Sequence, residues 1–117
     1  YIAGLLKFRF NTNMESNMYT DCQQSIPDGG ISISSLWAST RPDDIYLQLT
    51  GHEYADIEVK YLIVVEKEGI FKRLCEDNFH LRMGAILITG CGFPDISTRA
   101  CVARIAEKFQ VYIQVYS

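Results

Sequence analysis

The sequence lacks several features that would assign it to common classes of protein. Among its 117 residues, no apolar run approaches the roughly 20 residues that a membrane-spanning helix needs. Its start has no secretory signal pattern. Lysine and arginine total 11 against 14 aspartates and glutamates, which gives a net charge of −3. That balance excludes nucleic-acid binding through bulk positive charge and leaves room for a local metal site.

Cysteine and histidine are too scattered to indicate a disulfide framework or a metal cluster. No CxxC spacing joins the four cysteines, which are Cys22, Cys75, Cys91 and Cys101. The histidines, His52 and His80, have no companion at metal-ligand spacing. Only Cys91, between two glycines, is marked as a thiol to test for reactivity. We therefore expect a soluble, intracellular, reduced chain.

Apolar residues make up 48% of the chain, enough for the core of one domain or of a piece of one. The chain begins at Tyr1 without an initiator methionine and ends in a strand-like run at residues 111–117. Neither end has the polar, flexible composition of a domain boundary. We interpret the chain as a fragment.

Residues 1–58 are predicted to form a β-rich lead-in segment and a connector. Apolar and basic residues alternate over residues 6–10, as on a half-buried strand. Residues 18–23 return as the second strand of an expected hairpin, and residues 31–33 alternate again. Residues 34–58 indicate only a long connector with short helical turns.

Residues 59–117 have the pattern of a parallel α/β unit. Its strand, helix, strand, helix and strand are expected at residues 61–65, about 70–79, 85–89, about 96–109 and 111–115. The first two strands are unbroken apolar, β-rich runs, which is typical of parallel strands buried on both faces. The predicted fold class is α/β, with a Rossmann-like parallel sheet, flanking helices and the β-rich segment before it.

Ligands of open parallel sheets bind beyond the carboxyl ends of the strands, where two segments of this chain fall. Glu66 directly follows the first buried strand. Its carboxylate suits a hard cation such as Mg²⁺, or it favours the start of the next helix through the helix dipole. Glu68 is a secondary candidate for binding the metal. The alternative is that its side chain is simply solvated on the surface.

The second segment, residues 90–95, follows the second buried strand. Gly90-x-Gly92 lacks the remaining residues of known phosphate-binding loops, so a tight turn is the alternative. Asp95 is placed to cap the following helix. Arg99 lies one turn into that helix, where either an anionic partner or a surface salt bridge explains its cation.

Two motifs, in this order, resemble the Toprim domain found in the meiotic double-strand-break transesterase and in the topoisomerase VI A subunit. Residues 61–74 resemble the family's strand ending in Val-Glu-Lys-Glu or Val-Glu-Lys-Asp and its Phe-x-Arg-Leu helix. Residues 87–99 resemble its Gly-Lys-Gly-x-Pro-Asp-x-x-Thr-Arg motif. The detailed resemblance covers residues 61–109; residues 5–33 fit the family's β-rich segment more loosely, and residues 36–57 match little.

The resemblance implies a Mg²⁺-dependent enzyme that cuts both strands of a DNA duplex. In the family, a tyrosine of a winged-helix domain attacks the backbone, and the partner subunit's Toprim domain supplies the metal. Glu66 matches the metal-binding glutamate, beside which Mg²⁺ neutralises charge on the phosphate. Gly92, Pro94, Asp95 and Arg99 match the second motif, which is expected to shape the DNA-binding rim of the site.

The resemblance also implies partners and a location. Expected partners are double-stranded DNA, the ATPase B-type subunit, and a second A-type subunit in a homodimer, with no membrane. The expected location is the nucleus for a eukaryotic source and the cytoplasm otherwise. The resemblance is compatible with an enzyme that relaxes supercoils and with one that initiates recombination.

Three departures from the family pattern bear on activity. Cys91 replaces the lysine between the glycines, no winged helix with its tyrosine precedes the segment, and the family's Asp-x-Asp is not reached by Ser117. We therefore expect residues 59–117 to be a partial Toprim domain, truncated before the acidic pair. This chain is predicted to hold no catalytic residue and to be inactive alone.

Three hypotheses about function remain open. The first is a fragment of a DNA-cleaving subunit. The second is a non-catalytic interaction module or relic, which dimerises with the full-length enzyme or competes for its partners through an exposed last strand. The third is a binder of a small phosphate ligand through the turn at residues 90–95.

Overall fold

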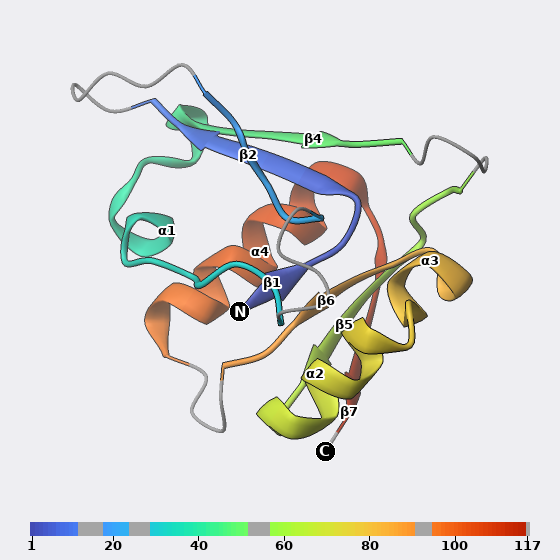
Figure 1. Ribbon diagram of the computed structural model, residues 1–117. Coiled ribbons are helices and arrows are strands. Elements are labelled where there is room, and N and C mark those ends of the chain that lie inside the picture. The colour runs from blue at the N-terminus through green and yellow to red at the C-terminus, as the bar shows by residue number, and fades with distance from the viewer. Residues whose placement is uncertain (12–17, 24–28, 52–56, 91–94, 117) are drawn as a thin grey trace.

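In the computed structural model, the chain folds into four layers of helices and sheets (Figure 1). The structure describes residues 1–11, 18–23, 29–51, 57–90 and 95–116. Its helices are α1 (Leu36–Ser39), the 3-10 helix η1 (Pro42–Asp44), α2 (Glu68–Glu76), α3 (Phe79–Met83) and α4 (Ile96–Phe109). Its strands are β1 (Ile2–Ala3), β2 (Leu6–Phe10), β3 (Thr20–Asp21), β4 (Ile45–Leu49), β5 (Tyr61–Val65), β6 (Ala85–Ile88) and β7 (Tyr112–Tyr116).

The larger sheet has the strand order β1-β6-β5-β7. Its central strand β5 runs parallel to both neighbours, with Val64 in register with Ile88 of β6 and with Val115 of β7. Strand β1 pairs antiparallel with the outer side of β6. The carboxyl ends of β5, β6 and β7 therefore lie along one edge of this sheet.

The two faces of the larger sheet are covered by different helices (Figure 1). Leu62, Ile86 and Ile88 pack on the side of α4, together with Cys101 and Ile105. Ile63, Val65 and Leu87 pack on the other side, against Phe71 and Cys75 of α2. Full burial of such aliphatic side chains contributes about 1.5–3 kcal/mol each, which explains the unbroken apolar runs of β5 and β6.

The smaller sheet has the strand order β3-β2-β4 and is antiparallel. The buried side chains of β2 and β4 join the same core cluster as α4 and Trp37 of α1; they are Leu6, Phe8, Ile45 and Leu47. Helix α4 is thus enclosed between the two sheets.

Local chemistry explains where the helices break. Helix α2 ends at Glu76, and Asn78 has left-handed dihedral angles that turn the chain into α3. Gly84 ends α3 with a φ of 63°, and a Cβ atom there would overlap the carbonyl oxygen of Glu58. Only glycine fits that position without strain.

The α/β class and most of the predicted elements are confirmed. Helix α4 begins and ends as predicted, β5 covers residues 61–65, β6 ends one residue early, and β7 lies one residue later than expected. The helix expected at about residues 70–79 is instead divided into α2 and α3.

The short helical turns predicted for residues 34–58 are confirmed by α1 and η1, but the prediction of a connector alone was wrong, because it missed strand β4. Strand β4 pairs with β2 along its full length, so the smaller sheet depends on it. Residues 31–33 form only an isolated bridge, from Ile31 to Ile2. The domain division after residue 58 stays a prediction, and β1 from the first part lies at the edge of the second part's sheet. No helix in the described ranges is long and apolar enough to cross a membrane.

Candidate metal-binding edge of the parallel sheet

The end of β5 and the end of β7 lie side by side at the carboxyl edge of the larger sheet. Val65 is in register with Tyr116. The backbone N–H of Glu66 donates a hydrogen bond to the carbonyl oxygen of Tyr116, at 3.0 Å. The last residue of β7, Tyr116, is thereby brought beside Glu66, although the two are far apart in sequence.

Glu66 is exposed at this edge and lies just before helix α2. The N-cap residue of α2 is Lys67, which has an extended backbone and makes no side-chain cap. Glu66 consequently lies one residue before the N-cap, beside the positive end of the helix dipole. This position suits either interpretation of Glu66, as a ligand of a cation or as a stabiliser of the helix start.

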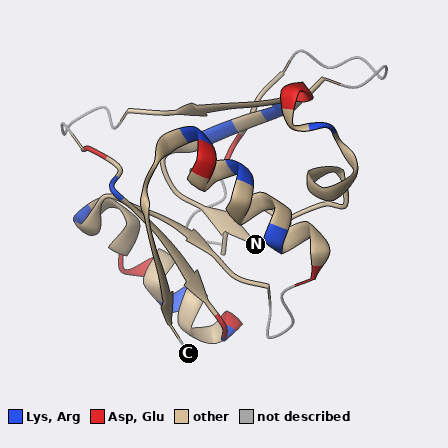
Figure 2. Cartoon of the chain, turned by 180° about the vertical axis from the view of Figure 1, so that it is seen from behind, with Lys and Arg blue, Asp and Glu red and all other residues tan. Residues whose placement is uncertain are grey.

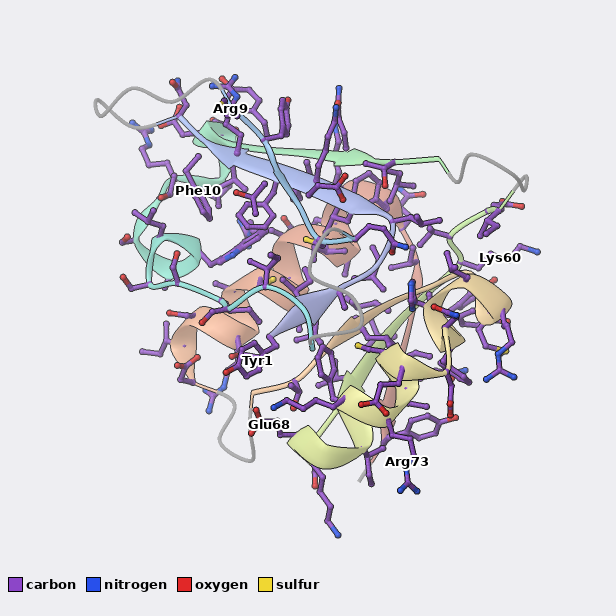
Figure 3. All side chains as sticks on the ribbon, in the orientation of Figure 1. Tyr1, Arg9, Phe10, Lys60, Glu68 and Arg73 are labelled. Atoms are coloured by element: carbon purple, nitrogen blue, oxygen red, sulfur yellow. The ribbon has the colours of Figure 1, made fainter. Side chains whose placement is uncertain are left out.

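Glu68 lies in the first turn of α2 and has a partner on its own helix. Its Oε1 atom is 3.3 Å from Nζ of Lys72, one turn further on. Figure 3 labels Glu68 at the start of α2. A metal role for Glu68 remains a prediction.

Asp95 caps helix α4, as predicted. Its Oδ1 atom accepts a hydrogen bond from the backbone N–H of Thr98 at 2.8 Å. Hydrogen bonds from the backbone and the hydroxyl of Thr98, and then from the backbone of Ser97, lower the pKa of the Asp95 carboxyl. They do so because they favour the charged form. The carboxylate is therefore engaged by its own helix.

Arg99 is exposed on the first turn of α4. Within the described ranges its guanidinium has no carboxylate in ion-pair contact. The surface salt bridge considered for Arg99 is therefore not found there, and its role at the rim stays a prediction. The predicted rim residues Gly92 and Pro94, with Cys91 between the glycines, lie outside the described residues.

The remaining thiols do not act as nucleophiles. Cys22, Cys75 and Cys101 are buried in the core. Burial raises the pKa of Cys22 to about 12 and that of Cys75 to about 11, and it also raises the pKa of Cys101. Because the thiolate is the reactive species, all three are inert near neutral pH.

The donor set at this edge is small. Within the described residues, no group of three or more histidine, cysteine, aspartate or glutamate side chains could hold a metal ion. Glu66 thus offers one carboxylate. Mg²⁺ in proteins is commonly held by one or two carboxylates with waters and substrate phosphate, so one carboxylate fits as part of such a site and needs further ligands.

A shallow hollow beside Glu66 was not predicted from the sequence. Lys67, Gly69, Ile70 and Arg73 line it, along α2 and its N-cap. Of its two cations, Lys67 directly follows the candidate metal ligand, whereas Arg73 lies in the last turn of α2. The helical spacing of these residues is visible in the sequence, but the hollow between them is not.

A parallel sheet with a glutamate at the end of its central strand, covered by helices on both faces, defines a Toprim-like α/β domain. A sequence model for the Toprim domain of Spo11 and of the A subunit of topoisomerase 6 matches residues 61–116. This segment of the chain belongs to that family, as the motifs indicate.

Curated relatives resemble about half of the chain. Over 64 residues it is 38% identical to the meiotic recombination protein SPO11 of Mus musculus, covering 54% of this chain and 16% of that protein. Over 63 residues it is 40% identical to the A subunit of the type 2 DNA topoisomerase 6 of Aeropyrum pernix, covering 52% and 16%. Over 56 residues it is 45% identical to the meiotic recombination protein SPO11-1 of Oryza sativa subsp. japonica, covering 48% and 14%. The chain thus spans less than a fifth of the length of these relatives.

Proposed function

We propose that this chain is part of a DNA-cleaving subunit of the topoisomerase VI A/Spo11 type and contributes to the metal-binding half of its site. One observation carries the proposal. Glu66 is the first residue after the central strand, at the edge where three parallel strands end, inside the segment that matches the Toprim domain. The domain assignment proposed here is a partial Toprim domain at residues 59–117, after a β-rich lead-in segment at residues 1–58.

The chemistry proposed for Glu66 is to hold a Mg²⁺ ion. Such an ion neutralises charge that develops on a phosphate and orients the scissile group. Glu66 supplies one carboxylate ligand, and the exposed position leaves room for waters and a phosphate oxygen. Asp95 and Arg99 are proposed to border the site from the start of α4, with Glu68 as a secondary ligand.

The attacking tyrosine and further carboxylates are proposed to come from other parts of the protein or from a partner. The proposed partners are double-stranded DNA, an ATPase B-type subunit, and a second A-type subunit. The proposed location is the nucleus of a eukaryote or otherwise the cytoplasm. The relatives' names include both a topoisomerase and recombination proteins, so both roles stay open.

A test of the metal site uses Mn²⁺ as a paramagnetic probe for Mg²⁺. In the 117-residue chain, we expect Mn²⁺ to broaden the amide NMR signals of residues around Glu66 and Tyr116, and excess Mg²⁺ to reverse the effect. Glu66→Gln removes the charged ligand at nearly constant shape and should abolish the local broadening. Glu107→Gln, which removes a carboxylate on α4 that pairs with Arg104, is the matched control. Equal broadening in wild type and Glu66→Gln would contradict the proposal.

A second candidate function is the non-catalytic interaction module. The observation that favours it is strand β7, which leaves large apolar side chains exposed: Tyr112, Ile113, Val115 and Tyr116. In this alternative the chain pairs with another copy or with a full-length subunit through β7. A chain that stays monomeric over a range of concentrations would count against pairing between copies.

A further inference from the structure

Two cations lie on the outer face of the smaller sheet. Lys7 and Arg9 alternate along β2 with the core residues Leu6, Phe8 and Phe10, so they occupy the opposite face. Figure 2 shows basic residues along this strand. In Figure 3, Arg9 lies at the outside of the sheet, whereas Phe10 lies on the side of α1.

Tyrosine rings on the neighbouring chain segments hold both cations in place. The guanidinium of Arg9 lies 4.4 Å from the ring centre of Tyr46 on β4, its partner in register, and 5.7 Å from that of Tyr19. The ammonium of Lys7 lies 4.9 Å from the ring of Tyr19. Such contacts use the face of the guanidinium and leave its in-plane N–H donors available to an anion.

Within the described residues, no carboxylate forms an ion pair with either of the two cations. Asp21 is in register with Lys7, but its Oδ1 atom accepts a hydrogen bond from the backbone N–H of Gln23 at 2.9 Å. Neither Lys7 nor Arg9 forms an ion pair with any residue that the structure describes. Positions two apart on a strand are about 6.6 Å from each other, so the two charges form a short, pre-arranged row.

We propose that this surface, the β2 face (Lys7, Arg9, Tyr19, Tyr46 and Gln48), binds the phosphate backbone of duplex DNA. The choice of DNA rests on the proposed function, while the positions of the charges rest on the geometry alone. Arginine, lysine, tyrosine and glutamine are the side chains that commonly contact phosphates, and a stacked arginine is suited to bidentate contact. The face is locally basic although the whole chain is acidic, with a net charge of −3.

The β2 face is remote from the candidate metal-binding edge. Strand β2 lies on the far side of α4 from β5, and the start of α2 lies at the opposite end of the molecule (Figure 1). The DNA held by the β2 face is therefore a segment away from the scissile phosphate. Its contacts add affinity and orientation without sequence preference.

The test measures binding of the 117-residue chain to a short fluorescein-labelled duplex by anisotropy over a range of salt concentrations. In the double variant Lys7→Gln with Arg9→Gln we expect roughly tenfold weaker binding at low salt. We also expect the slope of log affinity against log salt to fall by about 1.8, since two phosphate contacts contribute about 0.9 each.

The matched control loses the same two charges elsewhere. Lys60→Gln with Arg82→Gln changes residues at the amino-terminal end of β5 and on α3. This control should retain the wild-type affinity and salt slope. An equal loss in both double variants would mean that net charge alone decides binding, which overturns the proposal.

A second pair of variants tests the tyrosine support of Arg9. Tyr46→Phe keeps the ring and should bind DNA as wild type does, whereas Tyr46→Thr keeps β-propensity, removes the ring and should weaken binding several-fold. Thermal unfolding followed by circular dichroism checks that each variant is folded. Equal affinities of the two Tyr46 variants would overturn the ring's role, even if the charge variants fail to fold.

Three further outcomes would overturn the proposal: no duplex binding by wild type at low salt, tighter binding of a single strand of the same sequence, or equal displacement by polyglutamate. The Mn²⁺ experiment separates this inference from the proposed function. Suppose that the Lys7→Gln, Arg9→Gln variant shows the normal Mn²⁺ broadening around Glu66 and binds DNA as tightly as wild type. The proposal for the β2 face is then overturned, while the proposed metal site stands.

Discussion

At the residue scale, Asp95 links the sequence motif to the start of a helix. The residue follows the second motif's proline and accepts the Thr98 N–H that α4 leaves without an intrahelical partner. Its position is thus explained by helix capping alone. A rim role can be added to that structural role, because the side chain is exposed at the same edge as Glu66.

Replacement of Asp95 is expected to lower stability in a pH-dependent manner. Its pKa lies below the ordinary value of 3.8 in the folded chain, so the charged cap stabilises the fold above that value. The contribution is lost as pH falls through the lowered pKa, where the folded carboxyl takes up its proton. Urea unfolding should therefore show wild type to be more stable than Asp95→Ala at pH 7, with a smaller difference in strong acid.

Asp95→Asn controls for shape, since asparagine also caps helices but does not titrate. Its stability relative to Asp95→Ala should not depend on pH in the acid range. A wild-type advantage that persists unchanged into strong acid would show that the charge of Asp95 contributes nothing.

At the scale of the element, β7 differs from the other parallel strands. Strands β5 and β6 are covered on both faces, whereas every residue of β7 is exposed and its outer edge has no paired strand among the described residues. Exposed apolar edge strands are templates for pairing with another chain. The same strand brings its carboxyl end to Glu66, so a chain that covered β7 would lie beside the proposed metal ligand.

A lysine on β7 is expected to reduce association without loss of stability. Val115 is 63% exposed, so Val115→Lys should change the free energy of unfolding by less than about 0.5 kcal/mol. Sedimentation velocity over a range of concentrations should show less self-association than in wild type. Met83→Lys, at an exposed apolar position on α3, is the control and should leave association unchanged. If both variants behave as wild type, β7 is not the associating surface.

At the scale of the whole molecule, one aromatic cluster ties the smaller sheet to the helix beneath it. Trp37 is 1% exposed, with its ring centre 5.0 Å from that of Phe8 and 5.2 Å from that of Phe10. This cluster continues into Cys101 and Ile105 of α4, which also face the larger sheet. The two sheets therefore share one core.

Truncation of Trp37 is expected to destabilise the entire chain. Trp37→Ala should lower the free energy of unfolding by about 3–5 kcal/mol, because a large cavity opens between α1, β2 and α4. Trp37→Phe should cost less than Trp37→Ala, since the phenyl ring fills most of the cavity. Both variants remove a buried Nε1–H that lacks a hydrogen-bond partner in the described part of the chain. Urea unfolding followed by circular dichroism and tyrosine fluorescence should show one transition. Separate transitions would mean that the sheets are independent.

Local sequence patterns were sufficient to predict the elements whose burial pattern or helix cap involves only a few neighbouring residues. The run at residues 61–65 predicted β5, and Asp95 with the following helical spacing predicted both ends of α4. Alternation of Ile45, Leu47 and Leu49 marked β4, but the surrounding polar residues concealed it. Strand β1 has two residues, too few for any period, and exists because β6 offers it a hydrogen-bonding edge.

The order of the parallel elements, the family motifs and the glutamate after the central strand could all be predicted from sequence. These features depend on near neighbours along the chain: side-chain period, turn residues and a helix cap. Three others required the folded chain: the end of β7 lies beside Glu66, β4 completes the smaller sheet, and Lys7 and Arg9 share an outer face with two tyrosines. Strand pairing joins residues far apart in sequence, because the hydrogen-bonding edges of strands have no sequence-local partner.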